Sequence, residues 1–176
     1  MRFLISIFVF SFVFQSAFSQ ALTSKTFKKA EKAYYKNEFA KAKELYVNTI
    51  ETYSDCAPCH AQLANIFANE SDFESGLEEI NKAIDLEEKN KNEEGNLGYY
   101  YSIRSFLYFN LDDFDSSQED ISKAIKNDNK NNNYYFMRSL MRRMKGDIVG
   151  CCQDLEMAKE LGNKKAEDYI TIYCVK

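Results

Sequence analysis

The feature that most constrains this chain is a repeat of 34 residues, which aligns without gaps in the blocks 23–56, 57–90, 98–131 and 132–165. Small residues fill three aligned columns: Ala30, Ala64, Ser105 and Ser139; Ala42, Gly76, Ser117 and Cys151; Thr49, Ala83, Ala124 and Ala158. Bulky residues fill two more: Phe39, Phe73, Phe114 and Ile148; Tyr46, Ile80, Ile121 and Leu155. A period of this length predicts a solenoid, in which each repeat packs only against its neighbours.

Each block predicts two helices joined by a polar turn. In the second block they span about 57–69 and 73–86, and the later helix has apolar residues at steps of three and four, which places them on one buried face. An aspartate precedes the second helix in three blocks: Asp72, Asp113 and Asp147. A short acceptor at this position can cap exposed backbone N–H groups. The small columns allow two antiparallel helices to approach closely where they cross.

The columns resemble the tetratricopeptide repeat (TPR) family. Tyr101 and Tyr135 occupy the column in which that family prefers a large aromatic residue, and His60 falls in the same column. Leu63-Ala64 is similar to the family's Leu-Gly step, and Gly146-Asp147-Ile148 to its Gly-Asp-Tyr turn. The resemblance implies an all-α fold, an α-solenoid of four helix-turn-helix repeats.

We also expect a C-terminal capping helix over 164–175 and a single repeat domain over 20–176. The composition agrees with a nearly all-helical chain, because it contains only six Gly and one Pro among 176 residues. Its 12 Tyr and 14 Phe are a heavy aromatic content that can fill helix interfaces.

The first residues, 1–19, have the pattern of a secretory signal peptide. A positive Arg2 precedes an apolar run over 3–14, and Ala17-Phe18-Ser19 offers small residues before cleavage at Gln20. The run is too short for a transmembrane helix. We therefore expect a small exported bacterial protein, periplasmic or secreted, with no transmembrane anchor after cleavage; an uncleaved anchor is the alternative.

An oxidising compartment would allow disulfides to persist. The stretch from Gly146-Asp147 through Cys152-Gln153-Asp154 and Lys159-Glu160-Leu161-Gly162 to Tyr173-Cys174 resembles the C-terminal end of small exported TPR proteins. The resemblance implies a bond between Cys152 and Cys174, which would close a loop of about 22 residues and stabilise the fold by roughly 3 kcal/mol. The adjacent Cys151 is the alternative partner, and the sequence alone does not separate the two.

The segment Cys56-Ala57-Pro58-Cys59-His60 has three interpretations. It matches the C-x-x-C-H motif for c-type haem attachment, with the chain's one histidine, His60, as the iron ligand. It also matches a redox dithiol at a helix N-terminus, where a thiol pKa can be lowered. We favour the third interpretation, a structural pair that forms a Cys56–Cys59 disulfide or remains as two thiols in the turn between repeats.

Signatures of other functions are missing. The chain has no Gly-rich phosphate loop, and one histidine leaves no Ser-His-Asp triad or repeated His ligand set. Carboxylate pairs such as Glu78-Glu79 are interpreted as solvated faces. A net charge of −4 and the lack of a basic run argue against nucleic acid. We expect no enzymatic activity, no cofactor and no metal site.

In the TPR family the first helix of each repeat lines a concave groove. Carrying those columns over predicts an aromatic groove that includes Phe27, Tyr34, Asn65, Phe106, Phe109, Phe136, Leu140 and Arg143. Some members clamp a carboxylate with Lys, Asn and Arg, but here only Asn65 and Arg143 fit. The groove favours a protein or peptide partner with an apolar face. Alternatives are a C-terminal helix that covers part of the surface, self-association, and a structural role in cell-envelope assembly.

Overall fold

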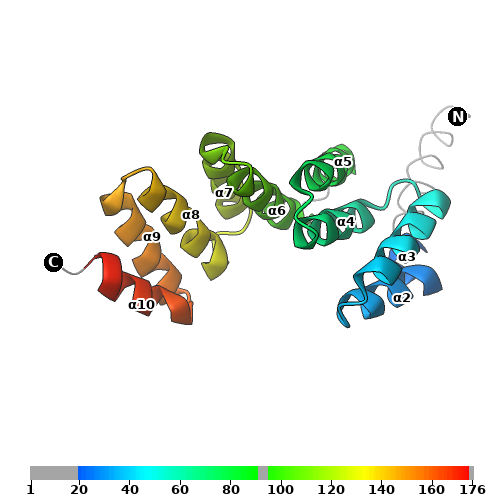
Figure 1. The fold of residues 1–176 in the computed structure, drawn as a ribbon, viewed down its shortest axis with the longest axis horizontal. Coiled ribbons are helices and arrows are strands. Elements are labelled where there is room, and N and C mark those ends of the chain that lie inside the picture. The colour runs from blue at the N-terminus through cyan, green and yellow to red at the C-terminus, as the bar shows by residue number, and fades with distance from the viewer. Residues whose placement is uncertain (1–19, 91–94, 175–176) are drawn as a thin grey trace, which may run out of the picture. The chain divides into compact units, whose positions relative to one another are not determined.

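The computed structural model describes residues 20–90 and 95–174. Its described helices are shown in Figure 1: α2 (Lys25–Tyr34), α3 (Phe39–Thr52), α4 (Ala57–Asn69), α5 (Phe73–Asn90), α6 (Leu97–Asn110), α7 (Phe114–Asn127), α8 (Asn132–Met144), α9 (Ile148–Glu160) and α10 (Lys164–Tyr173). The expected signal peptide over 1–19 lies outside the described residues, as does the last residue of the predicted capping helix, Val175.

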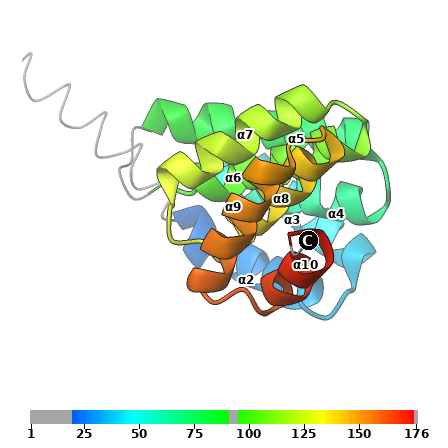
Figure 2. The same ribbon diagram turned by 90° about the vertical axis from the view of Figure 1, so that its left-hand side faces the viewer.

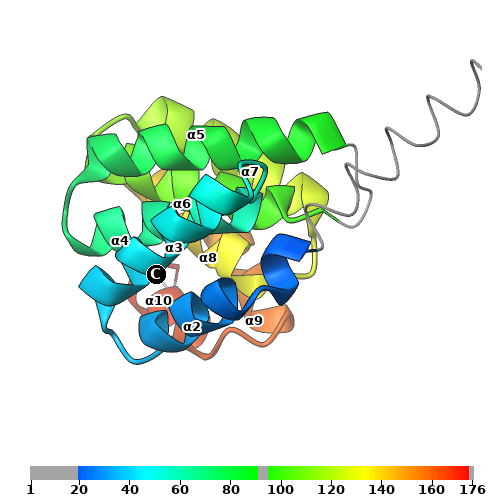
Figure 3. The same cartoon turned by 90° about the vertical axis from the view of Figure 1, so that its right-hand side faces the viewer.

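The helices form antiparallel pairs, one pair to each sequence block, and α10 follows as the capping helix. This arrangement confirms the predicted fold class. The chain divides into two compact units, with the division between Asn90 and Lys91. The first unit contains α2 to α5, whose opening pair α2 and α3 faces the viewer in Figure 3, and the second contains α6 to α10, seen in Figure 2.

The small columns are buried where the paired helices cross, as predicted. All eight residues of the first two columns are buried. Between α6 and α7 the contact also has reciprocal hydrogen bonds, because Ser105 Oγ donates to the Ser117 carbonyl and Ser117 Oγ donates to the Ser105 carbonyl, each at 2.8 Å. Small side chains therefore bring two backbones close enough for each hydroxyl to reach the opposite carbonyl oxygen.

The turn inside each repeat uses a left-handed residue at the same place in the alignment: Asn37, Ser71, Asp112 and Gly146, with φ of 59°, 61°, 60° and 80°. Asn, Asp and especially Gly adopt this conformation at low steric cost. The next residue then caps the second helix in three blocks. Asp72, Asp113 and Asp147 accept the backbone N–H groups of the residues three positions later, as predicted.

A buried ion pair recurs in the second unit. Arg104 of α6 donates to both carboxylate oxygens of Asp120 in α7, at 2.6 and 3.0 Å. Arg138 of α8 does the same to Asp154 in α9, at 2.9 and 2.7 Å. The two aspartate side chains are only 3% and 4% exposed. Each arginine also lies near the ring of the aromatic residue three positions before it, 5.5 Å from Tyr101 and 5.7 Å from the equivalent tyrosine.

These ion pairs were not predicted from the sequence. They occupy equivalent positions in two blocks and are separated by 16 residues in both cases. The repeat of the arginine and of the aspartate was therefore visible in the sequence. That the arginine lies close to the aspartate follows only from the antiparallel pairing of the helices.

Candidate functional site

The segment 56–60 contains two cysteines and the chain's one histidine, and it forms the start of α4. A disulfide joins Cys56 and Cys59, and both residues are fully buried. His60 is 8% exposed, and its Nδ1 lies 2.6 Å from Glu79 Oε2 of α5. Glu79 Oε1 also accepts from Lys82 Nζ at 2.6 Å. In this repeat Leu63 stands where the second unit has its buried arginine, and His60, one turn earlier, contacts the acidic residue instead.

These residues do not fit the haem or the redox interpretation. Both sulfurs that would attach to a haem are bonded to each other, and the imidazole is held by a carboxylate inside the repeat. The fully buried disulfide is also closed to a thiol partner. The interpretation of Glu78-Glu79 as a solvated face was wrong for Glu79, because its side chain is only 15% exposed and pairs with His60.

Burial alone would raise the pKa of Glu79, but the hydrogen bonds from His60 and Lys82 oppose this effect and leave the pKa below its ordinary value of 4.5. The carboxylate therefore stabilises the fold fully above pH 4.5, and this contribution is lost as the pH falls through the lower folded-state pKa.

We expect the Glu79→Gln variant to unfold at a lower temperature than the wild type at neutral pH, and the difference to shrink at about pH 3. Thermal unfolding followed by circular dichroism measures both values. The matched control is Glu78→Gln, on the exposed side of the same helix. A difference that stays constant with pH would contradict the role assigned to the Glu79 charge.

At the other end of the chain a disulfide joins Cys152 of α9 to Cys174 at the end of α10, and Cys151 is a free buried thiol. Burial raises the pKa of the Cys151 thiol, which keeps it protonated and slows its exchange with the neighbouring disulfide. Cys151 lies in a small-residue column at the crossing with α8, whereas Cys152, one residue on, faces α10.

The predicted groove residues of the first unit are part of its packing. Phe27 stacks edge-on against Tyr46 at 6.1 Å between ring centroids, and Tyr34 does so against Phe39 at 5.7 Å. Both are half-buried against the unit's core. Asn65 is also half-buried and donates to Gln62 at 3.0 Å.

The polar groups on the first helices of this unit are connected. Gln62 donates to Glu31 at 3.4 Å, and Glu31 also accepts from the hydroxyl of Tyr46, a fully buried tyrosine whose pKa is raised by burial and by this hydrogen bond. Asn65 was a predicted groove residue, whereas this network, which joins side chains from three helices, was not predicted.

The second unit exposes more of its predicted groove residues. Phe106 of α6 is 43% exposed, and Arg143 of α8 is exposed, while Phe109 and Leu140 are half-buried. Met141 of α8 packs at the crossing of α6 and α7, where its Sδ lies 3.3 Å from Ser117 Oγ of α7 and 3.9 Å from Ser105 Oγ of α6. We call these four residues, Phe106, Phe109, Leu140 and Arg143, the first-helix surface.

The C-terminal helix α10 covers part of the predicted groove, which was one of the alternatives considered from the sequence. The ring of Tyr169 lies 5.0 Å from that of Phe136, measured between centroids. The guanidinium of Arg143 lies 4.0 Å from the centroid of Tyr173. Phe136 therefore packs against the capping helix. Arg143 is oriented by its stacking on Tyr173, and its guanidinium N–H groups remain available to bind an anion.

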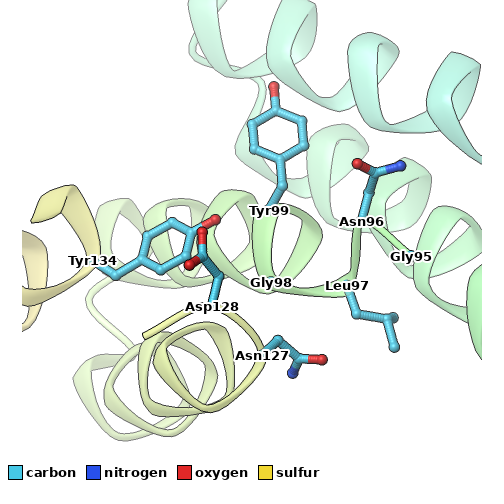
Figure 4. A pocket seen from close by; sticks show the side chains of 8 residues that line it. All are labelled: Gly95, Asn96, Leu97, Gly98, Tyr99, Asn127, Asp128 and Tyr134. Atoms are coloured by element: carbon cyan, nitrogen blue, oxygen red, sulfur yellow. The ribbon is translucent and has the colours of Figure 1, made fainter. Parts of the chain in front are cut away.

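A small polar cavity of about 180 Å³ lies beside the start of α6 (Figure 4). Tyr134 and Asp128 point toward one another across it, and Tyr99 points away from them. Burial raises the pKa of Tyr134, and Asp128 accepts the backbone N–H of Lys130 at 3.0 Å. This volume is below the roughly 300–1,000 Å³ of ordinary ligand pockets, so the cavity suits a few water molecules.

No protein-family model matches the chain, and no curated protein matches its sequence. Solved structures do match its fold. The APC/C hetero-tetramer Cut9–Hcn1 matches with a TM-score of 0.76 and 13% identity, over 82% of this chain but only 28% of the length of that chain. YrrB, described as a TPR protein with an unusual peptide-binding site, matches with a TM-score of 0.64 and 12% identity, over 82% of this chain and 74% of that one.

The first TPR of Spaghetti (RPAP3), bound to the HSP90 peptide SRMEEVD, matches with a TM-score of 0.59 and 18% identity, over 67% of this chain and 90% of that one. These similarities establish the TPR fold of the chain. Among its described residues, none of the helices combines the length and the apolar character that crossing a membrane requires.

Proposed function

We propose that this protein is a non-enzymatic, exported scaffold that binds a peptide segment of another protein through its first-helix surface. The exposure of Phe106 is the main support for this proposal. A phenylalanine that is 43% exposed on a first helix, with the half-buried Phe109 one turn later and the half-buried Leu140 at the equivalent position of α8, provides an apolar contact that a partner could cover. Peptide binding by the similar TPR structures that contain or describe a peptide site agrees with this use of the fold.

The residues indicate the chemistry of the peptide. An apolar or aromatic side chain would contact Phe106 and Leu140, and an acidic group would pair with Arg143, whose guanidinium is oriented by Tyr173. The carboxylate clamp of Lys, Asn and Arg is not expected here, because Phe136 occupies a position where such a clamp has lysine. The preferred ligand is therefore an apolar segment with a nearby acidic residue.

Export is part of the proposal. Two disulfides in one small chain would be unusual in a reducing compartment, and the segment 1–19 has the composition of a leader. N-terminal sequencing of the protein from its own host tests this point: a chain that starts at Gln20 supports export, and a chain that retains residues 1–19 contradicts cleavage.

A peptide library displayed on phage and selected on the oxidised protein tests peptide binding. We expect enrichment of apolar sequences with an acidic residue. Phe106→Ala should weaken the selected peptides by about tenfold, because loss of a central aromatic contact typically costs more than 1 kcal/mol. Fluorescence anisotropy measures the affinities.

The matched control is Tyr35→Ala, which removes another exposed aromatic ring, 76% exposed at the end of α2. Selected peptides that bind Phe106→Ala and wild-type protein equally well would contradict the assignment of the site to the first-helix surface. Circular dichroism of both variants checks that neither has lost its helices.

A further inference from the structure

A second apolar surface lies at the start of α9, and Tyr173, which stacks with Arg143 of the first-helix surface, forms one edge of it. Its most exposed residues are Val149 at 73%, Ile148 at 46% and Met157 at 39%. They line a cavity of about 630 Å³ with Tyr173 and the Cys152–Cys174 disulfide. We call it the C-terminal pocket. Its volume lies within the range of binding sites for several side chains.

The preceding repeats show what normally covers this position. Within each unit, the end of a first helix lies over the start of the second helix before it. The end of α8 covers the start of α7, where Lys145 pairs with Asp115. The end of α4 likewise reaches α3, where Lys43 pairs with Glu70 at 3.0 Å and lies 3.8 Å from the Phe67 ring centroid.

In the last repeat this cover is incomplete. The helix α10 takes the place of the next first helix, as Figure 2 shows beside α9, but it has 10 residues where α4, α6 and α8 have 13, 14 and 13. Its end is held at Cys152, one turn after the start of α9. Val149, which is equivalent to the paired Asp115, has an apolar side chain, and within 95–174 no helix end lies over it.

The rim of the pocket is acidic. Glu156 and Glu160 lie four residues apart on α9 and thus on the same side of the helix. Both are exposed, and neither forms an ion pair with any residue in the described ranges. An occupant that carries Lys or Arg beside its apolar face would complement both the apolar floor and these carboxylates.

We propose that the C-terminal pocket docks an amphipathic helix of a protein partner, with apolar side chains against Ile148, Val149 and Met157 and a basic residue against Glu156 and Glu160. The partner helix takes the position over the start of α9 that the end of α8 takes over the start of α7. The geometry is the helix-in-groove mode of recognition. The expected ligand differs in charge from that of the first-helix surface, for which an acidic peptide is expected.

The test uses a synthetic helical peptide with leucine at i, i+3, i+4 and i+7 and lysine beside that stripe, and a twin in which glutamate replaces lysine. Fluorescence anisotropy measures binding to the oxidised protein. We expect the lysine peptide to bind more tightly, and Val149→Asp to weaken it by about tenfold. The added aspartate would attract the basic peptide, so a loss cannot be a charge effect.

Val47→Asp is the matched control, because Val47 is also exposed, at 42%, on α3 in the other unit. It should leave the affinity within about twofold. The double variant Glu156→Lys/Glu160→Lys should reverse the preference between the two peptides. Since Val149 is already largely exposed, its replacement should retain the fold, and circular dichroism verifies this.

Equal effects of Val149→Asp and Val47→Asp, or no binding of either peptide, would overturn the proposal. Sedimentation velocity of the wild type gives a further decisive outcome. A dimer that Val149→Asp dissociates would assign the pocket to a second copy of this chain and overturn the assignment to a different protein.

Discussion

Replacing Arg104 with methionine is expected to lower the free energy of unfolding of the second unit by about 3 kcal/mol. The variant keeps the aliphatic volume but leaves Asp120, whose side chain is 3% exposed, without its two charged hydrogen bonds. Lys123 remains 3.6 Å from Asp120 and limits the loss. Urea unfolding followed by circular dichroism measures the change as a lower midpoint.

Two variants control this result. Arg138→Met should cost less, because Arg142 Nη1 also lies 3.0 Å from Asp154 and continues to neutralise it. The double variant Arg104→Met/Asp120→Leu should recover most of the loss, since removing both charges leaves no unpaired carboxylate. A cost below about 1 kcal/mol for Arg104→Met would mean that the pair behaves like a solvent-exposed salt bridge.

Removing the C-terminal disulfide in the variant Cys152→Ala/Cys174→Ala is expected to lower the free energy of unfolding by roughly 3 kcal/mol, because the bond closes a loop with a sequence separation of 22. The bond also fixes the end of α10, so the loss should fall on α10 and α9. Hydrogen exchange would show the protection of α10 decreasing first.

Reductant provides the control for this prediction. It should destabilise the wild type strongly and the double variant much less, since the remaining bond joins Cys56 to Cys59 across a separation of only three residues and constrains the unfolded chain less. If reductant destabilises the variant as much as the wild type, the short Cys56–Cys59 disulfide accounts for the stability instead.

Much of the fold could be predicted because it depends on local patterns that recur. The small columns predicted the helix crossings, and Asp72, Asp113 and Asp147 predicted the starts of second helices that the structure shows. The extent of α5 was less predictable. It continues to Asn90 rather than ending near Leu86, because the polar residues that follow are good helix formers and nothing before Asn90 stops the helix.

The candidate sites were less predictable, because exposure depends on neighbouring elements. Phe106 and Phe136 occupy neighbouring repeats of the same groove pattern, yet one is exposed and the other packs against Tyr169. They stand about one helical turn apart in the alignment, so their own positions already differ. The cover over Phe136, however, comes from Tyr169 of α10, which lies outside its block.

The sequence by itself determined the repeat period, the helix pairs and the small residues at their crossings, because each depends on spacing along one chain segment. Only the tertiary structure decided that His60 contacts Glu79, that Arg104 contacts Asp120, and that the start of α9 is left open beside α10. These contacts join side chains from different helices, so their distances depend on how far each helix extends and which neighbour it meets.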